Sequence, residues 1–328
     1  MIHRYPAWAR SLLVGWVGVT IASAAFAQPD YPTKPIRMII PLAAGSAVDK
    51  AARVVTQQMA INLGQPIVIE NQPGASGMIG ADRVADAAPD GYTLGGFNDS
   101  ILTMVPHLHR NMPWDPLKDF TSVSLVATVE WGLVVPADSG WKTASDVIEA
   151  AKRRPNSFTF GSGGNGSPQH IAMALFSGMA GVQMMHVPYK GATPAAVAVA
   201  SNEVQAGFQG LGTVVGLIQG NKLKLLAVST PERLPQFPDT PTVIESGLPG
   251  FTFDSWFLIV APAGTSALVV DRLNNAVRLA LDDENVRSQL IGLGMTPRGS
   301  SAAELAKLTR ANLARYEKLI HDNGIQPE

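Results

Sequence analysis

The stretch IRMIIPLAAGSAVD, residues 36–49, decides the fold class. Its apolar start, Ile36–Ile40, is typical of a buried strand, and a loop containing Gly and Ser follows from Pro41. From Asp49 to Leu63 apolar residues recur at helical spacing. The stretch therefore predicts a strand, a loop and a helix in the order that builds an α/β layer.

The same alternation continues along most of the chain. Further strands are expected at 66–70, 92–95, 131–135, 158–161, 184–187, 204–208 and 223–229, with helical patterns between most of them. After a strand at 256–260 only helices are expected, at about 266–282, 284–292 and 301–322. Ser301 and Glu304 form a capping box for the last of these. Alternating units predict an α/β fold with parallel sheets covered on both faces.

The length of the chain predicts two domains, because about 300 mature residues exceed what one core usually fills. We expect the chain to cross between two sheets near 126–135 and to return near 253–260. Domain 1 is then 28–127 plus 255–328, and domain 2 is 128–254. A junction that is crossed twice acts as a hinge, which permits the domains to close around a ligand.

The N-terminus has the plan of a secretory signal peptide. Arg4 and Arg10 precede an uncharged apolar run, and Ala25-Phe26-Ala27 forms a small-x-small cleavage site. We expect residues 1–27 to be removed and the mature protein to reside in the periplasm. The alternative is an N-terminal membrane anchor, but the apolar run is shorter than the roughly 20 residues that a spanning helix needs.

Composition excludes several classes of protein. The chain has 25 Lys and Arg against 26 Asp and Glu, and residues 1–27 contain two Arg and no acid, so the mature balance is 23 − 26 = −3. Nothing in that balance attracts nucleic acid. The absence of Cys excludes disulfides and thiolate chemistry. An apolar content of 46% excludes a disordered chain.

Four Gly- and Ser- or Thr-containing loops connect strands to helices, at residues 41–49, 71–77, 161–168 and 188–194. Ligands of open α/β sheets bind outside the carboxyl ends of strands, and free N–H groups at helix N-termini favour anions. Facing loops of this kind predict a cleft for a carboxylate. The alternative is ordinary connection chemistry, because Ser167-Pro168 and Thr193-Pro194 are good helix starts in any protein.

Ordered motifs along the mature chain resemble the Bug family, the substrate-binding proteins of tripartite tricarboxylate transporters. They are YPTKPIR (31–37), LGQP (63–66), VIENQPGA (68–75), PDGYTL (89–94), KDF (118–120), HVPYKG (186–191) and APAGT (261–265). The resemblance implies a type II periplasmic-binding-protein fold, with a cleft that holds carboxylates partly through backbone amides. We further expect a monomer without cofactor or metal, whose partners are the permease subunits of such a transporter.

Departures from the family pattern leave the ligand open. The first loop reads Pro41-Leu42-Ala43-Ala44-Gly45-Ser46, where the family usually has Pro-Phe-x-x-Gly-Gly. Phe97-Asn98-Asp99-Ser100 replaces a Gly/Thr-rich turn, and Gln205 replaces a common acid. A dicarboxylate, a tricarboxylate, an amino acid or an aromatic acid all remain candidates.

The predicted ligand-binding residues lie on or next to these loops. Four of them have structural alternatives: Asp49 as the capping partner of Ser46, Lys190 as a solvated lysine, Trp256 as a core aromatic and His170 as a packing residue. The full set is Leu42, Ala43, Ala44, Gly45, Ser46, Asp49, Gly74, Ala75, Ser76, Asn98, Asp99, Ser100, Ser162, Gly163, Asn165, Ser167, His170, Tyr189, Lys190, Gln209 and Trp256.

Signals for an enzyme are weak. Residues 161–166 match G-x-G-x-x-G, but the first acid after them is Glu203, too far along to hold a ribose. There is no G-x-S-x-G elbow or Walker sequence, and His107 and His109 have no Cys or carboxylate cluster nearby to complete a metal site. We therefore expect a binding protein rather than an enzyme. The alternatives are a ligand-loaded partner of a sensor kinase and, less favoured, a secreted hydrolase.

Overall fold

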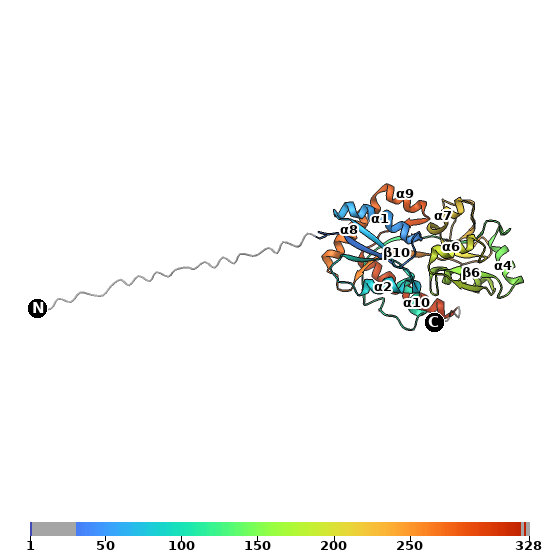
Figure 1. Ribbon diagram of the computed structural model, residues 1–328, viewed down its shortest axis with the longest axis horizontal. Coiled ribbons are helices and arrows are strands. Elements are labelled where there is room, and N and C mark those ends of the chain that lie inside the picture. The colour runs from blue at the N-terminus through green and yellow to red at the C-terminus, as the bar shows by residue number, and fades with distance from the viewer. Residues whose placement is uncertain (2–30, 323–324, 326–328) are drawn as a thin grey trace. The chain divides into compact units, whose positions relative to one another are not determined.

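The computed structural model describes Met1, residues 31–322 and Ile325 (Figure 1). It confirms the strand, loop and helix expected of residues 36–63, as β1 (Ile36–Ile40) and α1 (Ala47–Leu63). Four of the five β1 residues are buried, as expected for a strand inside a sheet. The predicted leader, residues 1–27, lies outside the described residues except for Met1.

Lobe 1, as we name the larger half, is built on a six-stranded sheet in the order β11-β4-β10-β3-β1-β2. Its strands are β1, β2 (Ile67–Asn71), β3 (Thr93–Asn98), β4 (Phe120–Val129), β10 (Ser255–Pro262) and β11 (Met295–Pro297). Its helices are α1, η1 (Ala75–Gly77), α2 (Met78–Ala85), α3 (Ser100–Thr103), η2 (Val105–His107), α8 (Ala267–Asp282), α9 (Glu284–Gly292) and α10 (Ala302–Asp322).

Lobe 2 comprises the elements between β4 and β10, and it contains two small sheets, in the orders β8-β5-β9 and β6-β7. Its strands are β5 (Trp131–Pro136), β6 (Thr159–Ser162), β7 (Met185–Pro188), β8 (Gly207–Gly210) and β9 (Leu223–Val228). Its helices are α4 (Ala144–Arg153), α5 (Pro168–Ala180), α6 (Ala192–Ala200) and α7 (Leu211–Gln219).

The expectation of purely parallel sheets is wrong for the strands that enter each lobe. β1, β2 and β3 are parallel, but β10 runs antiparallel to β3 and β4. β5 likewise runs antiparallel to β8 and β9. The carboxyl ends of β1, β3, β8 and β9 face the other lobe, so a strand that arrives from that lobe must run the opposite way.

The C-terminal region also differs from expectation in one element. β11 pairs with β4, although no strand was expected after 260, because its three residues are too few to give a periodic pattern. The capping box before α10 is confirmed: Ser301 Oγ accepts from Glu304 N at 3.2 Å, and Glu304 Oε2 accepts from Ser301 N at 2.8 Å.

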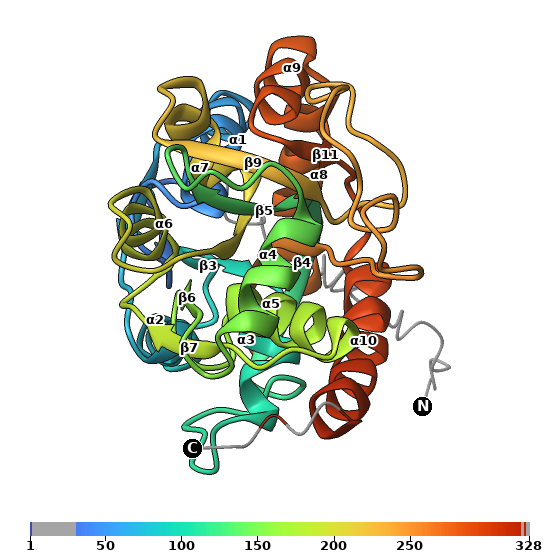
Figure 2. The ribbon, with the colours of Figure 1, turned by 90° about the vertical axis from the view of Figure 1, so that its right-hand side faces the viewer.

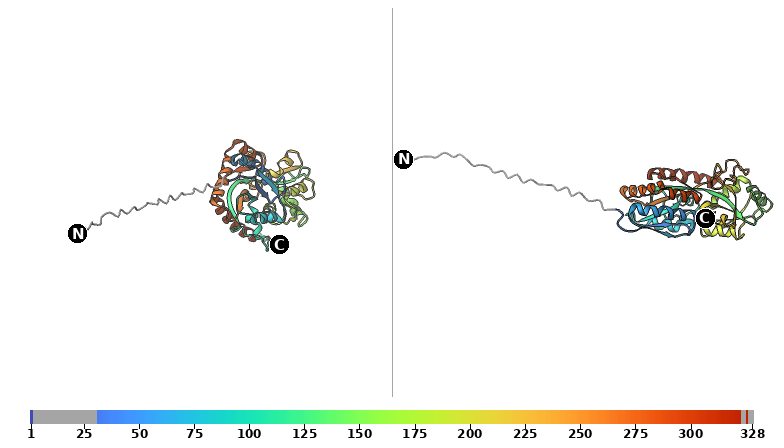
Figure 3. Two further views of the ribbon diagram at one scale, coloured as in Figure 1. Left: turned by 60° about the vertical axis from the view of Figure 1, so that its left-hand side comes forward. Right: turned by 90° about the horizontal axis from the view of Figure 1, so that it is seen from above.

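Two chain crossings join the lobes, one between β4 and β5 and one before β10. Figure 2 shows β5 and β9 of lobe 2 toward the viewer, and in Figure 3 the blue and orange elements of lobe 1 lie apart from the yellow-green elements of lobe 2. Residues from Tyr31 onward form one compact unit, and its main apolar cluster contains buried side chains of both lobes, such as Met38 and Phe208. The two-domain division with its boundaries at 127/128 and 254/255 stays a prediction.

Candidate functional site

A cavity of about 480 Å³ lies between the two lobes, and we call it the interlobe cavity. The carboxyl-terminal ends of strands and the loops that follow them form its walls, as expected for ligand sites in open α/β sheets. Lobe 1 contributes Pro41, Leu42, Ser46, Ala47, Val48, Pro73, Gly74, Ala75, Ser76, Gly77, Met78, Asn98, Ser100, His109 and Val129. Lobe 2 contributes Trp131, Gly163, Gly164, Asn165, Ser167, Pro168, Gln169, Pro188, Tyr189, Lys190, Gly191, Ala192, Gly210 and Thr213.

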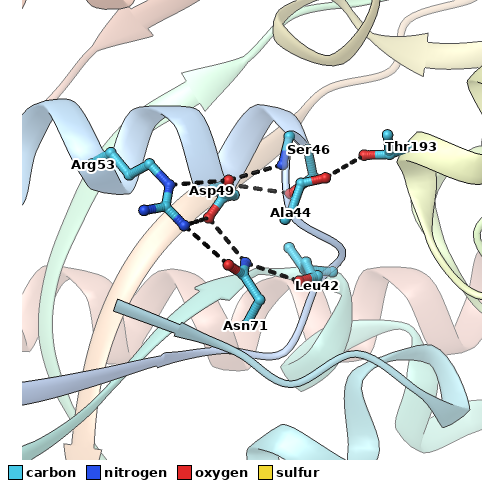
Figure 4. Close-up of polar contacts among 8 residues, drawn as sticks. Leu42, Ala44, Ser46, Asp49, Arg53, Asn71 and Thr193 are labelled. Carbon is cyan, nitrogen blue, oxygen red and sulfur yellow. Dashed lines mark hydrogen bonds and ion pairs between the residues drawn. The ribbon is translucent and has the colours of Figure 1, made fainter. Parts of the chain in front are cut away.

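The loop before α1 is held in place by the carboxylate of Asp49 (Figure 4). Asp49 Oδ2 accepts from Gly45 N at 2.8 Å, and Asp49 Oδ1 accepts from Arg53 Nη2 at 3.0 Å and from Asn71 Nδ2 at 2.9 Å. Asn71 Nδ2 also donates to Leu42 O at 3.2 Å. The carboxylate thus holds Gly45 directly and Leu42 through Asn71.

This network keeps Asp49 ionised. Burial by itself would raise the pKa of Asp49, but hydrogen bonds from Arg53, Gly45 and Asn71 outweigh burial and hold the pKa below its usual value. The expected capping box is present only in part. Ser46 Oγ accepts from Asp49 N at 3.3 Å, whereas the Asp49 carboxylate reaches Gly45 N rather than the backbone of Ser46.

The loop before α5 is held by neutral groups instead. Ser162 Oγ accepts from Gly164 N at 3.1 Å and lies 2.5 Å from His186 Nε2. His170 Nδ1 accepts from Gly166 N at 3.2 Å, and its ring stacks on that of His186 with centroids 4.0 Å apart and planes 4° apart.

Both imidazoles of this stack are uncharged near neutral pH. Burial, and secondarily the neighbouring His186, lowers the pKa of His170 to about 3. Burial also lowers the pKa of His186 to about 4. Two stacked rings with centroids 4.0 Å apart would repel each other strongly if both were charged. The close stacking therefore agrees with neutral imidazoles.

The short segment between β2 and α2 carries backbone strain at the cavity wall. Ala75 has φ = 45° and Ser76 has φ = 53°, in the left-handed region that side chains other than Gly rarely adopt. Such strain clusters at ligand sites, where the surroundings enforce it. Here Ser76 Oγ donates to Asn165 O at 2.5 Å, which ties the strained residue to lobe 2.

Other hydrogen bonds also cross between the lobes. Thr193 Oγ1 donates to Ala44 O at 2.8 Å, and Ala47 N donates to Thr213 Oγ1 at 3.0 Å. Lys50 Nζ donates to Gly212 O at 2.6 Å. The two lobes are therefore in direct contact around the cavity, in a closed arrangement.

The structure places the predicted binding residues in two groups. Those that line the interlobe cavity are Leu42, Ser46, Gly74, Ala75, Ser76, Asn98, Ser100, Gly163, Asn165, Ser167, Tyr189 and Lys190. Those that do not line it are Ala43, Ala44, Gly45, Asp49, Asp99, Ser162, His170, Gln209 and Trp256.

Four residues of the second group, Asp49, Asp99, Ser162 and Gln209, are buried. Asp99 is buried and its Oδ1 accepts from Trp256 N at 2.9 Å; burial raises the pKa of Asp99 to about 8. Gln209 is fully buried, and its Oε1 accepts from Gln169 Nε2 at 3.4 Å. These side chains act on the cavity through their neighbours.

Several lining residues were missed by sequence reasoning. Pro41, Gly164 and Gly191 lie on the quoted loops and could have been included from position alone. Trp131, Thr213 and His109 gave no local signal for ligand binding, because they come from a crossing strand, the first turn of α7 and a connection without a recognisable motif.

Basic and acidic side chains are distributed unevenly around the cavity. Among the described residues that line it there is no Asp or Glu, and Lys190 and His109 are its basic residues. Tyr189 donates to Glu203 Oε1 at 2.8 Å; burial and this bond raise the pKa of Tyr189 to about 12, so the phenol stays protonated. The electrostatic environment favours an anion.

Two further features bear on the class of protein. Across the described part of the chain, no helix combines the length and apolarity that crossing a membrane requires. Nor do three His, Cys, Asp or Glu side chains of that part gather closely enough to hold a metal ion.

Comparison with known proteins gives one family and close structural neighbours. Residues 51–325 match the family described as "Tripartite tricarboxylate transporter family receptor". Rpa4515 of R. palustris, solved with adipate, is 32% identical, has a TM-score of 0.88, and the match covers 91% of this chain and 100% of that one. MatC of Rhodopseudomonas palustris, solved with bound malate, is 32% identical with a TM-score of 0.83, covering 88% of this chain and 100% of that one.

The periplasmic binding protein BugD is a third neighbour. It is 28% identical to this chain and has a TM-score of 0.87, and the match covers 91% of this chain and 100% of BugD. These likenesses confirm the predicted α/β fold of the periplasmic-binding-protein type.

Proposed function

Because this chain belongs to the family of tripartite tricarboxylate transporter receptors, we propose that it captures a small carboxylate in the interlobe cavity and delivers it to a tripartite tricarboxylate transporter. The resemblance to the Bug family is confirmed, and the neighbours are periplasmic solute-binding proteins. Adipate and malate in two of them make a dicarboxylate a natural first candidate for this cavity.

The observation that carries the proposal is the number of helices that begin at the cavity. The first residues of α1, α2, α5 and α6 line it, and so does Gly210 at the start of α7. A helix N-terminus presents N–H groups that the helix itself does not use and the positive end of a helix dipole, worth about 0.3–1 kcal/mol for an anion when exposed and up to about 2 kcal/mol when partly buried.

Backbone groups rather than ion pairs would supply most of the binding energy. Gly163 and Gly164 let the main chain approach a ligand closely, and Ser46, Ser76 and Ser167 add hydroxyl groups to the same walls. Micromolar affinity needs about 8 kcal/mol, which several such hydrogen bonds in a closed cavity can provide. Lys190 is exposed and plays the secondary part.

The Ser162–His186 pair resembles a nucleophile and its base, yet its surroundings favour binding over catalysis. Ser162 is fully buried and does not line the cavity. His186 has no described carboxylate bonded to its ring, and its lowered pKa makes it a weak base. Incubation of the purified protein with candidate carboxylates should therefore give no turnover.

A thermal-shift screen of the mature protein tests the proposed function. Mono-, di- and tricarboxylates and aromatic acids are compared, because a ligand at 100 times its Kd adds about 2.7 kcal/mol of stability. At least one carboxylate should raise the Tm by several degrees, and matched neutral amides of the same acids should not. A panel in which no carboxylate raises the Tm contradicts carboxylate capture.

Export is the remaining part of the proposal. We expect cleavage after Ala27, because the positive start, the apolar run and the Ala-x-Ala pattern agree. Mass spectrometry of the protein released from the periplasm should find Gln28 as the first residue. A protein that retains residues 1–27 would be anchored rather than released.

A further inference from the structure

The hydroxyl of Ser255 joins the two chain crossings behind the wall of the interlobe cavity. Ser255 is the first residue of β10 and is fully buried. Its Oγ accepts hydrogen bonds from Trp131 Nε1 at 2.9 Å and from Asn98 Nδ2 at 3.1 Å. A serine oxygen has two lone pairs that accept hydrogen bonds, so these two donors use its whole accepting capacity. One buried atom therefore holds two side chains at once.

Both side chains that Ser255 holds belong to the cavity wall. Trp131 and Asn98 line the interlobe cavity, whereas Ser255 does not. Trp131 is the first residue of β5, in lobe 2, and Asn98 is the last residue of β3, in lobe 1. Asn98 Oδ1 also accepts from Ser100 N at 2.9 Å, which fixes the orientation of the amide. The hydroxyl of Ser255 thus connects wall residues of the two lobes where the chain crosses between them.

The surroundings of Trp131 leave its indole N–H dependent on Ser255. The ring packs edge-on against Phe253, with centroids 5.5 Å apart and planes 87° apart. On another side, a Cβ built on Gly210 lies 3.7 Å from Trp131 Cζ2. Within the described part of the chain, Ser255 Oγ is the one acceptor bonded to Trp131 Nε1. Buried donors are almost always paired, so the indole would have to move if this acceptor were removed.

Ser229 is a second buried serine at the same crossings, with a different role. Its hydroxyl donates to two backbone oxygens, Phe253 O at 2.5 Å and Trp131 O at 3.2 Å. Ser229 is 1% exposed, so it is as deeply buried as Ser255. Ser229 therefore ties the two crossings together through their backbones, whereas Ser255 holds side chains of the cavity wall.

We propose that Ser255 is a positioning residue for ligand capture, because its hydroxyl sets the orientation of Trp131 and Asn98 in the cavity wall. Ligand affinity then depends on a residue that does not itself line the cavity. Without the hydroxyl, two buried donors lose their acceptor, and the wall changes shape as they turn toward other partners. This inference rests on the proposed function and adds a residue that acts through two others.

A double-mutant cycle on ligand affinity tests this assignment. Calorimetry uses adipate and malate as probes or, if neither binds, the carboxylate that raises the Tm most in the screen. Ser255→Ala should raise the Kd about tenfold in the wild-type background. In the Trp131→Phe background, where the indole donor is already absent, the same change should raise it about threefold or less. Ser229→Ala is the matched control: it should lower the Tm but change the Kd less than about twofold in either background.

The indole N–H signal of Trp131 gives a second readout, which does not depend on how well Ser255→Ala folds. In nitrogen–proton correlation spectra of isotope-labelled protein, this signal is assigned by its absence from Trp131→Phe. Saturation of the wild-type protein with the probe should shift it. The signal of Trp141, assigned in the same way from Trp141→Phe, should stay in place, because Trp141 does not line the interlobe cavity.

Two results would overturn the role of Ser255 while carboxylate capture stands. The first is an increase of the Kd by Ser255→Ala that is the same in both backgrounds or is matched by Ser229→Ala. The second is a Trp131 signal that does not shift when the probe saturates the protein. If no carboxylate of the screen binds the wild-type protein, the proposed function itself fails, and this inference fails with it.

Discussion

The loop before α1 and the loop before α5 have the same plan. Each follows a strand, ends in a Ser that caps the next helix, and lines the interlobe cavity. The first is held by an ionised carboxylate, that of Asp49, and the second by the neutral imidazoles of His170 and His186. Similar backbone shapes at a binding site can therefore depend on opposite protonation chemistry, with different responses to mutation and pH.

The largest expected effect comes from removing the carboxylate of the first loop. Asp49→Ala leaves Gly45 N without its acceptor, removes one of the two acceptors of Asn71 Nδ2, and should lower the free energy of unfolding by about 3 kcal/mol, measured by urea denaturation. Asp282→Ala is the matched control, because Arg278 and Asp282 also form an i,i+4 pair. The Asp49 side chain is 3% exposed and that of Asp282 is 63% exposed. The control should cost at most about 0.5 kcal/mol, and an equal loss in both variants would contradict the role of Asp49.

A bulky residue in the second loop should damage binding more than loss of the lysine charge. A Cβ built on Gly163 lies 3.2 Å from Ala192 N and from Gly191 C, so Gly163→Val must displace the start of α6 and narrow the cavity. We expect its Kd for the best carboxylate to rise about a hundredfold, equal to about 2.7 kcal/mol, while Lys190→Gln costs about tenfold or less. Calorimetry on both variants tests this expectation. If Lys190→Gln alone abolishes binding, the anion is held by an ion pair and not mainly by backbone amides.

The pH dependence should separate the two loops. His170 is neutral in the folded protein, and in the unfolded chain it protonates below its ordinary pKa of 6.5. Protonation of His170 in acid therefore stabilises the unfolded chain. As a result, the free energy of unfolding decreases as the pH falls from 7 to 5. The loss from His170 is about 2 kcal/mol, from about 1.5 pH units at 1.36 kcal/mol each.

The contribution of His170 is measured as a difference, because other groups titrate in the opposite sense. The raised pKa of Asp99, about 8, makes the folded protein gain stability in acid. His170→Phe keeps an aromatic ring against His186 and cannot titrate. Between pH 7 and 5 the unfolding free energy of the wild type should fall by about 2 kcal/mol relative to this variant. The first loop should keep its hydrogen bonds over this range, because the pKa of Asp49 lies below its usual value and the carboxylate stays ionised. If the free energies of unfolding of the wild type and of His170→Phe change equally with pH, His170 does not titrate as proposed.

The smallest expected effect concerns the contact that joins α6 to the first loop. Thr193→Val keeps the shape of the side chain but removes the hydrogen bond to Ala44 O. The closed arrangement should lose about 1 kcal/mol, so ligand affinity should fall about fivefold in calorimetry. Thr193→Ser keeps the hydroxyl and should bind like the wild type. Equal affinities of the Val variant and the wild type would show that this contact does not favour closure.

Sequence reasoning predicted the elements better than their directions. Periodicity located β1, α1 and most later elements, but it gave no strand for Phe120–Val129, where the structure has the ten-residue β4. It gave β10 as one more strand of a parallel sheet, since direction depends on which lobe the chain arrives from, and no local residue records that. β11 was missed because three residues carry no period.

Site residues that lie on the Gly- and Ser-containing loops could be predicted from the sequence. Site residues that are placed by packing between distant segments could not. The Gly- and Ser-containing loops placed Ser46, Ser76 and Gly163 on the cavity wall from their positions in the sequence. Asp49 illustrates the limit, because its carboxylate bonds to Gly45, Arg53 and Asn71 and does not line the cavity. Asn71 lies at the end of β2, which local sequence around Asp49 does not reveal. His109 could not be distinguished from His107, because only the packing against α10 separates their environments.

The place of β10 in the sheet sets the order in which the chain can finish folding. β10 lies between β3 and β4, yet it follows the whole of lobe 2 in the sequence. A chain that emerges N-terminus first, from a ribosome or through a membrane, must leave the facing edges of β3 and β4 unpaired until Pro262 has emerged. Unpaired strand edges are templates for aggregation. A chain truncated between β9 and β10 should therefore be a substrate for chaperones and proteases, even though every element of lobe 2 is present.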